Sequence, residues 1–74
     1  MKIQPGVYEH FKGNRYRVIG EVALDESVTG ARIAGVLYVP LYGEGEPTVR
    51  TFGNFTEVLD KPGYSGPRFK FISE

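Results

Sequence analysis

Hydrophobic and polar residues alternate along much of this chain, most clearly between residues 16 and 24. The apolar set there comprises Tyr16, Val18, Gly20, Val22 and Leu24. A period of two residues predicts a β-strand with one buried face, because successive side chains of a strand point to opposite sides. We therefore expect these even-numbered residues to face a core, and the odd-numbered residues between them to face mostly water.

A tight turn before this strand is predicted by Gly13-Asn14. Both residues tolerate the positive φ of the two-residue hairpin turns whose twist matches that of β-strands. The turn joins the strand to an earlier one that Pro5-Gly6 opens. One face of that first strand forms either a contact surface or an ordinary solvated face, and it carries Tyr8, His10 and Lys12.

Residues 33–42 are almost wholly apolar. A strand without alternation is covered on both faces, or it has an apolar face with a function. One face must belong to the core of a small barrel, so the other needs a cover from a loop, a partner chain or a ligand. Pro40 cannot donate a hydrogen bond to a neighbouring strand, and it predicts an edge, a bulge or a bend late in this strand.

The second half of the chain predicts shorter elements. Residues 48–52 form a short strand, and the spacing of Phe52 and Phe55 suits one 3₁₀ turn with both rings inward. Pro62-Gly63 takes the central positions of a type II turn, and residues 68–72 alternate again as a last strand. Together these elements predict an all-β domain, a small and partly open barrel of five or six antiparallel strands with one 3₁₀ turn before the last strand.

Length and composition narrow the class of protein. We expect the 74 residues to form one domain, residues 1–74, with residues 1–5 as a lead-in. The absence of cysteine excludes disulfides, thiol catalysis and cysteine-based zinc sites. The N-terminus lacks the apolar stretch of a signal peptide, and no apolar run approaches the ~20 residues that span a bilayer. We expect a cytoplasmic protein that does not associate with membranes.

Charge is balanced, with nine Lys plus Arg against nine Asp plus Glu. A dedicated nucleic-acid-binding protein usually has a basic surplus. The basic residues nevertheless fall mostly on predicted strands and a hairpin tip, whereas several acidic residues fall in loops. This distribution gives either a local basic face or the wet side of an antiparallel sheet.

Several motifs resemble those of a small bacterial family, domain of unknown function 1653. The opening run is Gly6-x-Tyr8-x-His10-Phe11-Lys12-Gly13-x-x-Tyr16-x-Val18-x-Gly20. Later segments that also resemble the family are Tyr38-x-x-Leu41-Tyr42, Val49-Arg50 followed by Phe55, and Pro67-Arg68-Phe69. The resemblance covers essentially the whole chain, and it implies an SH3-like β-barrel with no assigned biochemical activity.

The chain also departs from the family's pattern. Thr48, Thr51 and Asn54 stand where the family usually has Trp, Pro and Met, and the run 25–29 replaces one that begins with His. A role that depends on that Trp or that His is therefore not transferred to this chain.

His10 is the only histidine, and it is the candidate for acid–base chemistry. Such chemistry needs a nearby nucleophile or an orienting carboxylate. The neighbouring Glu9 points to the opposite face of the strand, although a residue distant in sequence can approach in the fold. One histidine, no cysteine and scattered acidic residues give no metal-ligand spacing. We predict no catalytic residue, no metal and no cofactor, and an enzyme that uses His10 remains the second alternative.

Arg50 and Arg68 are the candidates for anion contact, because a guanidinium matches phosphate or carboxylate geometry. The alternative is that they form ion pairs with Glu57, Glu9 or Asp60. The tyrosines are likewise either recognition residues or parts of the core. The residues predicted to form the ligand-binding surface are Tyr8, His10, Lys12, Tyr42, Arg50 and Arg68.

The sequence therefore predicts a non-enzymatic binding module for a phosphate-bearing or other anionic ligand, with single-stranded nucleic acid as its most concrete form. The first alternative is a protein-interaction module that uses the apolar face of residues 33–42. Its partner is then a peptide or a second copy of the chain.

Overall fold

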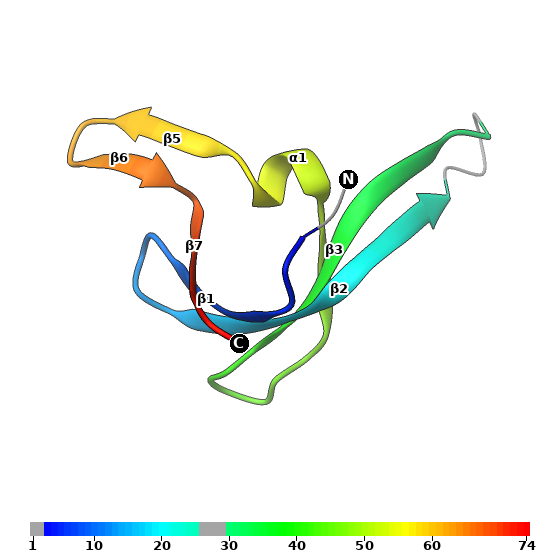
Figure 1. The fold of residues 1–74 in the computed structure, drawn as a ribbon, viewed down its shortest axis with the longest axis horizontal. Coiled ribbons are helices and arrows are strands. Elements are labelled where there is room, and N and C mark those ends of the chain that lie inside the picture. The colour runs from blue at the N-terminus through cyan, green and yellow to red at the C-terminus, as the bar shows by residue number, and fades with distance from the viewer. Residues whose placement is uncertain (1–2, 26–29) are drawn as a thin grey trace.

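The computed structural model describes residues 3–25 and 30–74, and these residues are nearly all β (Figure 1). They form seven strands and one helical turn: β1 (Gly6–His10), β2 (Arg15–Asp25), β3 (Arg32–Pro40), β4 (Thr48–Thr51), α1 (Phe52–Phe55), β5 (Val58–Lys61), β6 (Tyr64–Pro67) and β7 (Phe69–Ser73). The predicted all-β class is confirmed. The described strands outnumber the predicted five or six, because the chain between α1 and β7 forms a hairpin of its own.

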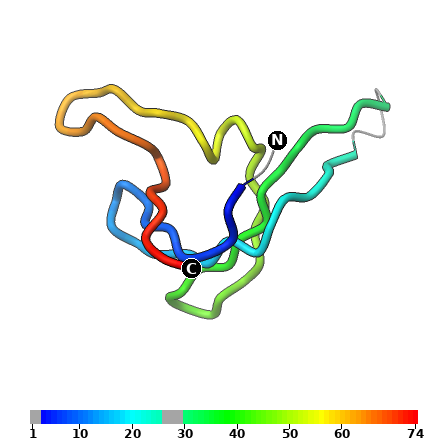
Figure 2. Tube along the Cα trace, in the orientation of Figure 1, coloured from blue at the N-terminus to red at the C-terminus, as the bar shows by residue number. Residues whose placement is uncertain are grey.

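Five strands form one antiparallel sheet in the order β4-β3-β2-β1-β7, and β5 pairs with β6 in a second sheet. The far end of the β2–β3 hairpin and the β5–β6 hairpin project on opposite sides of α1 (Figures 1 and 2). Within the described ranges β4 and β7 pair with each other nowhere, so the larger sheet is not closed into a barrel. The SH3-like barrel that the resemblance implies stays a prediction. The four-residue α1 is the one helix of the described residues, and none there is long and apolar enough to cross a membrane.

The helical turn predicted at Phe52 and Phe55 is present, as a short α-helix rather than a 3₁₀ turn. Three strands follow it, not one. Thr51 caps its start, since Oγ1 accepts a hydrogen bond from the Asn54 N–H at 3.2 Å. Thr56 closes its end, where the N–H and the Oγ1 both donate to the carbonyl of Phe52, at 3.0 and 2.8 Å.

The two predicted turns have different outcomes. Pro62-Gly63 joins β5 to β6 with Lys61 opposite Tyr64 and a φ of +88° at Gly63, as a type II turn requires. Gly13-Asn14 does not form a two-residue turn, because the loop spans residues 11–14. The His10 carbonyl accepts from Gly13 N–H at 2.7 Å, and the His10 N–H donates to the Asn14 carbonyl at 2.8 Å. Among the described residues only glycines have positive φ, so Asn14 cannot fill the position predicted for it.

The core is small and mostly aromatic, and it lies between α1 and one face of the sheet. Phe55 stacks on Phe69 with ring centroids 4.1 Å apart, and Tyr8 meets Phe55 edge-on at 5.4 Å. The buried apolar residues are Tyr8, Val18, Val36, Tyr38, Phe55 and Phe69.

A β-bulge at Ile19 divides β2 into two halves. Val18 lies opposite Tyr38, but the next pair joins Gly20 to Leu37, so Ile19 has no partner on β3. Beyond the bulge Val22 lies opposite Gly35. Gly35 and Leu37 alternate along β3 with the buried Val36 and Tyr38, and opposed residues share a face.

The prediction of one continuous core face is therefore wrong for the second half of β2. Tyr16 and Val18 face the core, whereas Val22 and Leu24 lie on the opposite side of the sheet. A Cβ placed on Gly35 would meet the Leu24 side chain at 3.2 Å and that of Val49 at 3.1 Å, so these side chains gather on the same side.

We call this second group of apolar residues the outer face, and it comprises Val22, Leu24, Ile33, Leu37 and Val49. Ile33 and Val49 are 46% and 40% exposed. The predicted apolar strand 33–42 ends earlier than expected, because Pro40 closes β3 and Leu41 and Tyr42 are exposed beyond it. The expectation of an apolar face that is not part of the core is met by the outer face.

Candidate anion-binding site

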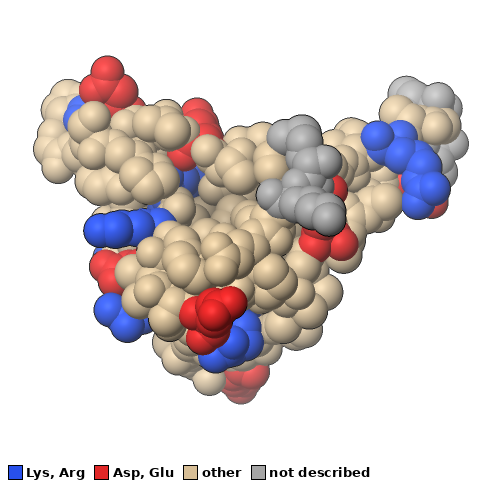
Figure 3. Space-filling view, in the orientation of Figure 1, with Lys and Arg blue, Asp and Glu red and all other residues tan. Residues whose placement is uncertain are grey.

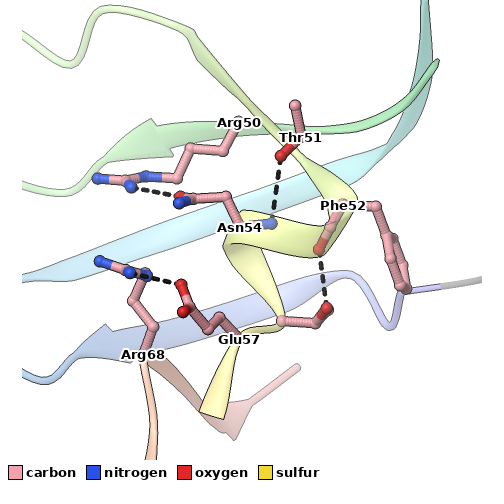
Figure 4. Close-up of polar contacts among 7 residues, drawn as sticks. Arg50, Thr51, Phe52, Asn54, Glu57 and Arg68 are labelled. Atoms are coloured by element: carbon pink, nitrogen blue, oxygen red, sulfur yellow. Dashed lines mark hydrogen bonds and ion pairs between the residues drawn. The ribbon is translucent and has the colours of Figure 1, made fainter. Parts of the chain in front are cut away.

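Arg50 lies on β4 opposite Val36, which places its side chain on the core side of the sheet. Its Nε donates to the hydroxyl of Tyr38 at 2.8 Å. Its Nη1 donates to Oδ1 of Asn54 at 2.7 Å (Figure 4). The guanidinium carbon is 5.3 Å from the ring centroid of Phe69. Neutral groups from three elements thus fix its direction without neutralising its charge.

Arg68 follows β6 and contacts Glu57 through both its side chain and its backbone. Its Nη2 lies 2.7 Å from Oε1 of Glu57, and its backbone N–H donates to the Glu57 carbonyl at 2.9 Å. Its Nε is buried without a hydrogen-bond partner. In Figure 4 the guanidinium groups of Arg50 and Arg68 point in the same direction, away from α1. Arg68 therefore forms one of the alternative ion pairs considered for it, whereas Arg50 forms none within the described ranges.

His10 is buried at the end of β1, on the core side of the sheet and not on an outer contact surface. Its ring packs against Phe11 and Phe69, with centroids 4.6 and 4.8 Å away. Its Nδ1 accepts a hydrogen bond from the backbone N–H of Lys12 at 3.2 Å, so the neutral ring carries its proton on Nε2.

Burial lowers the pKa of His10, and four surrounding positive charges lower it further: those of Arg50, Arg68, Lys12 and Lys61. The four cations come from β4, from the junction of β6 and β7, from the β1–β2 turn and from the end of β5. We call them the cationic cluster. In the space-filling view, Lys and Arg side chains occur along the left of the molecule, interspersed with acidic ones (Figure 3).

Phe11 connects the β5–β6 hairpin to the β1–β2 turn. The Lys61 ammonium lies 4.4 Å from the Phe11 ring centroid, and the Tyr64 ring lies 5.3 Å away. The Lys12 ammonium is 5.9 Å from the same ring. Phe11 thus brings cations from two hairpins to the same part of the surface.

Tyr42 lies at the rim of this region, 49% exposed. Its hydroxyl is 2.8 Å from that of Tyr16, whose ring packs edge-on to Tyr38 and Phe69. Burial raises the pKa of Tyr16 to about 12, and the hydrogen bond to Tyr42 acts in the same direction. Tyr42 is therefore a partly exposed ring that its neighbour Tyr16 holds in place.

A pocket of about 460 Å³ lies beside the cluster, between the end of β1, β6 and β7. Its volume is in the range of small-molecule sites. It shares His10 and Phe11 with the surroundings of the cluster, and the residues that line it are Glu9, His10, Phe11, Tyr64, Ser65, Gly66, Pro67, Lys70 and Ile72.

The predicted site residues are only partly brought together. His10, Lys12, Arg50 and Arg68 assemble, but Tyr8 does not belong with them. Tyr8 is a core residue, 7% exposed, whose hydroxyl donates to the Gln4 carbonyl at 2.8 Å. The face of β1 that carries Tyr8 and His10 is the inner one, so the predicted contact surface on that strand is wrong.

Sequence reasoning did not identify Lys61 and Asn54 as parts of the site. It considered Tyr38 only among the tyrosines that serve either recognition or the core. Lys61 reaches Phe11 only because the β5–β6 hairpin folds back, and no local pattern signals that approach. Asn54 is one of the positions at which the chain departs from the family's pattern, and this departure was the available signal. The described residues contain no group of three His, Cys, Asp or Glu side chains suited to hold a metal ion.

Comparison with known proteins gives two matches to this chain. Residues 6–71 match the sequence pattern of a family described as protein of unknown function (DUF1653). The crystal structure of a protein belonging to DUF1653 from Bordetella bronchiseptica is similar, with a TM-score of 0.75 and 27% sequence identity. That similarity covers 96% of this chain and 88% of the other. None of the curated proteins compared with the chain matches it.

Proposed function

Since this chain belongs to the DUF1653 family, which is described only as of unknown function, we propose its function from the geometry of the site. The domain binds an anionic, phosphate-bearing ligand at the cationic cluster and catalyses no reaction on it. The ligand contacts Arg50 and Arg68 first, with Lys12 and Lys61 at the sides and Tyr42 at the rim.

The arrangement of Arg50 is the observation that carries this proposal. Tyr38 and Asn54 occupy two of its N–H groups, which leaves further donors of the guanidinium for a ligand. Within the described part of the chain no carboxylate pairs with Arg50, so its charge is available to an anion. A guanidinium fixed by packing and hydrogen bonds loses little conformational entropy when it binds, which favours affinity.

Single-stranded nucleic acid is the most concrete ligand of this class. Phosphates match the guanidinium fork, and bases stack on exposed aromatic rings. Tyr42 supplies a ring that is 49% exposed, and Phe11 and Tyr64 line the adjacent pocket. Because the net charge is zero, we expect modest affinity and a short binding site.

An amide-shift NMR titration with short single-stranded RNA and DNA, and then with nucleotides, tests the proposal. We expect shifts centred on Lys12, Tyr42, Arg50 and Arg68 that weaken as salt is raised. In the same assay Arg50→Gln lowers the affinity about tenfold, as the loss of one charge-assisted hydrogen-bonding group implies.

Arg32→Gln is the matched control, because it also removes one positive charge. Arg32 lies on the projecting part of β3, where it pairs with Asp25 at 3.1 Å and is 71% exposed. We expect less than a twofold effect. Equal losses in the two variants would indicate unspecific attraction, and no shifts at either salt concentration would refute the proposal.

A protein-interaction function is the second candidate, and the exposed apolar outer face favours it. Ile33 and Val49 flank Gly35 on one side of the sheet, where they remain accessible to a partner. Association through this face is insensitive to salt, because it depends on apolar burial and not on phosphate contacts. Sedimentation of the wild type and of Val49→Lys over a range of concentrations separates the two functions.

A further inference from the structure

His10 is the only histidine of the chain, and its surroundings are mostly positive. Arg50 lies over the Phe69 ring and Lys61 over the Phe11 ring, and both rings pack against His10. The positive charges of Arg50, Arg68, Lys12 and Lys61 all lower the pKa of His10. Two carboxylates of this region have cationic partners of their own. Glu9 pairs with Arg15 at 3.2 Å, and Glu57 pairs with Arg68 at 2.7 Å.

The other side chains around His10 are uncharged rings or charged residues that line the pocket with it. Tyr16 on β2 presents its ring edge at 6.4 Å, and the Phe69 ring of β7 covers another side. Glu9 and Lys70 line the pocket together with His10, and they contribute opposite charges.

The hydrogen bond at Nδ1 fixes the neutral form of His10. Because Nδ1 accepts from the Lys12 N–H, a proton added there would displace this hydrogen bond. It would also place a fifth positive charge among the four cations. Burial and these charges hold the pKa of His10 below its ordinary value, which favours the neutral ring at pH 7.

An anion bound in the cationic cluster favours the protonated form of His10. Its negative charge offsets the repulsion between the cations, and it gives the imidazolium a partner of opposite charge. If the bound ligand raises the pKa of His10, then protonation of His10 must raise the affinity for the ligand by the same factor.

We propose that binding of an anion to the cationic cluster is coupled to uptake of one proton by His10 from solvent. The ligand binds more tightly as the pH falls, and the imidazolium becomes the fifth cation of the site. This inference rests on the proposed function, and it adds His10 as the residue that makes the affinity depend on pH.

Sulfate is the probe for the test, because its charge is constant over the whole range of the titration, whereas that of a phosphate monoester changes near pH 6. The single histidine gives one set of imidazole NMR signals, which are titrated from pH 8 to pH 4.5 in saturating sulfate. The reference is chloride at equal ionic strength. We expect sulfate to raise the pKa of His10 by about one unit, and its affinity to be about tenfold higher below both pKa values than above them.

His10→Gln retains an oxygen that can accept the Lys12 N–H, but it cannot be protonated in this range. We expect this variant to bind sulfate with an affinity that does not vary with pH, whereas Arg32→Gln retains the wild-type dependence. If His10→Gln does not fold, the pKa comparison on the wild type decides alone.

Two results would overturn the coupling, and they differ in what they leave standing. If sulfate shifts the amides of Arg50 and Arg68 while the pKa of His10 stays constant, the anion site stands and the coupling is wrong. If sulfate shifts no amide of the cluster at any pH, the proposed function fails, and the coupling fails with it.

Discussion

Arg50 takes its orientation from side chains that lie far from it in sequence or beyond its own strand. Tyr38 comes from β3, Asn54 from α1 and the Phe69 ring from β7. The chemistry of a guanidinium was enough to mark Arg50 as an anion candidate in the sequence. Its neutral partners were not predictable, because they depend on how β4 and α1 meet.

Asn54→Ala tests how much the fixed orientation of Arg50 contributes to the affinity for the ligand. The variant removes the oxygen that accepts from Nη1 of Arg50 but leaves every charge of the site in place. We expect the affinity for a short single-stranded oligonucleotide to fall about fivefold, which corresponds to about 1 kcal/mol for an arginine that must be ordered on binding. Isothermal titration calorimetry measures the change, and an unaltered affinity would show that Asn54 does not position Arg50.

His10 also makes the free energy of unfolding of the protein without ligand depend on pH. Its pKa is lowered in the folded state, whereas the unfolded chain keeps a value of about 6.5. As the pH falls below about 6.5, the unfolded state binds a proton that the folded state does not, and the free energy of unfolding decreases. Above that pH the contribution of the neutral ring is fully present.

We therefore expect the urea midpoint of the wild type to decrease between pH 7 and pH 5.5. The same measurement on His10→Gln should show a much smaller decrease. Parallel curves for the two proteins would mean that other groups cause the pH dependence.

At the scale of elements, the sequence predicted what local patterns determine. Pro62-Gly63 formed its turn, and the alternation of Tyr16 and Val18 placed both on the core side. The same alternation was misleading for Val22 and Leu24, because the bulge at Ile19 exchanges the two faces and leaves no mark in the pattern of residue types. The four-residue loop around Gly13 was also not predicted. Glycine fits several types of turn that need a positive φ, so its presence does not specify the length of the loop.

The β5–β6 hairpin depends on Phe11 for its position. Phe11→Ala removes the contacts with Tyr64 and with Lys61, which are worth about 1–2 kcal/mol together. We expect amide hydrogen exchange in residues 58–67 to become about tenfold faster, while β2 and β3 keep their protection. Ile33→Ala, on the outer face, is the control and should leave exchange in that hairpin unchanged.

Gly6 fixes the approach of β1 to β7. Its φ is +144°, and a Cβ at this position would collide with the carbonyl oxygen of Ser73. Gly6→Ala should lower the free energy of unfolding by about 2 kcal/mol, because strained backbone and collision act together. Gly53→Ala in α1 is the matched control, because no atom beyond its chain neighbours and the backbone of α1 lies within 4 Å of the added Cβ, and helix propensity rises. Thermal unfolding that ranks the two variants in the opposite order would contradict this account.

At the scale of the whole molecule, the zero net charge and the cationic cluster together determine how the affinity for the ligand should depend on salt. The balance of charge follows from composition alone. The convergence of four cations was not predictable, because they come from segments as far apart as Lys12 and Arg68. It also suggested Tyr8 as a contact residue, because nothing in the alternation of β1 shows which of its two faces is inner.

Four phosphate contacts predict a slope of about −3 for log K against log salt, at roughly −0.7 for each contact to a single strand. Fluorescence anisotropy of a labelled oligonucleotide at several salt concentrations measures this slope. Arg50→Gln should make the slope less steep by about 0.7, and Arg32→Gln should leave it unchanged. A slope near zero in the wild type would exclude phosphates as the main contacts.

The bulge at Ile19 allows one pair of strands to serve two surfaces that need not change together. As far as Val36, which lies opposite Glu21, β3 contributes to the core beneath the cationic cluster, whereas nearer the tip the hairpin carries Leu24 and Ile33 on a different face. Substitutions in one half leave the inward and outward directions of the other half intact. The hairpin can therefore diverge in its projecting part, by mutation or by design, while the anion site retains its geometry.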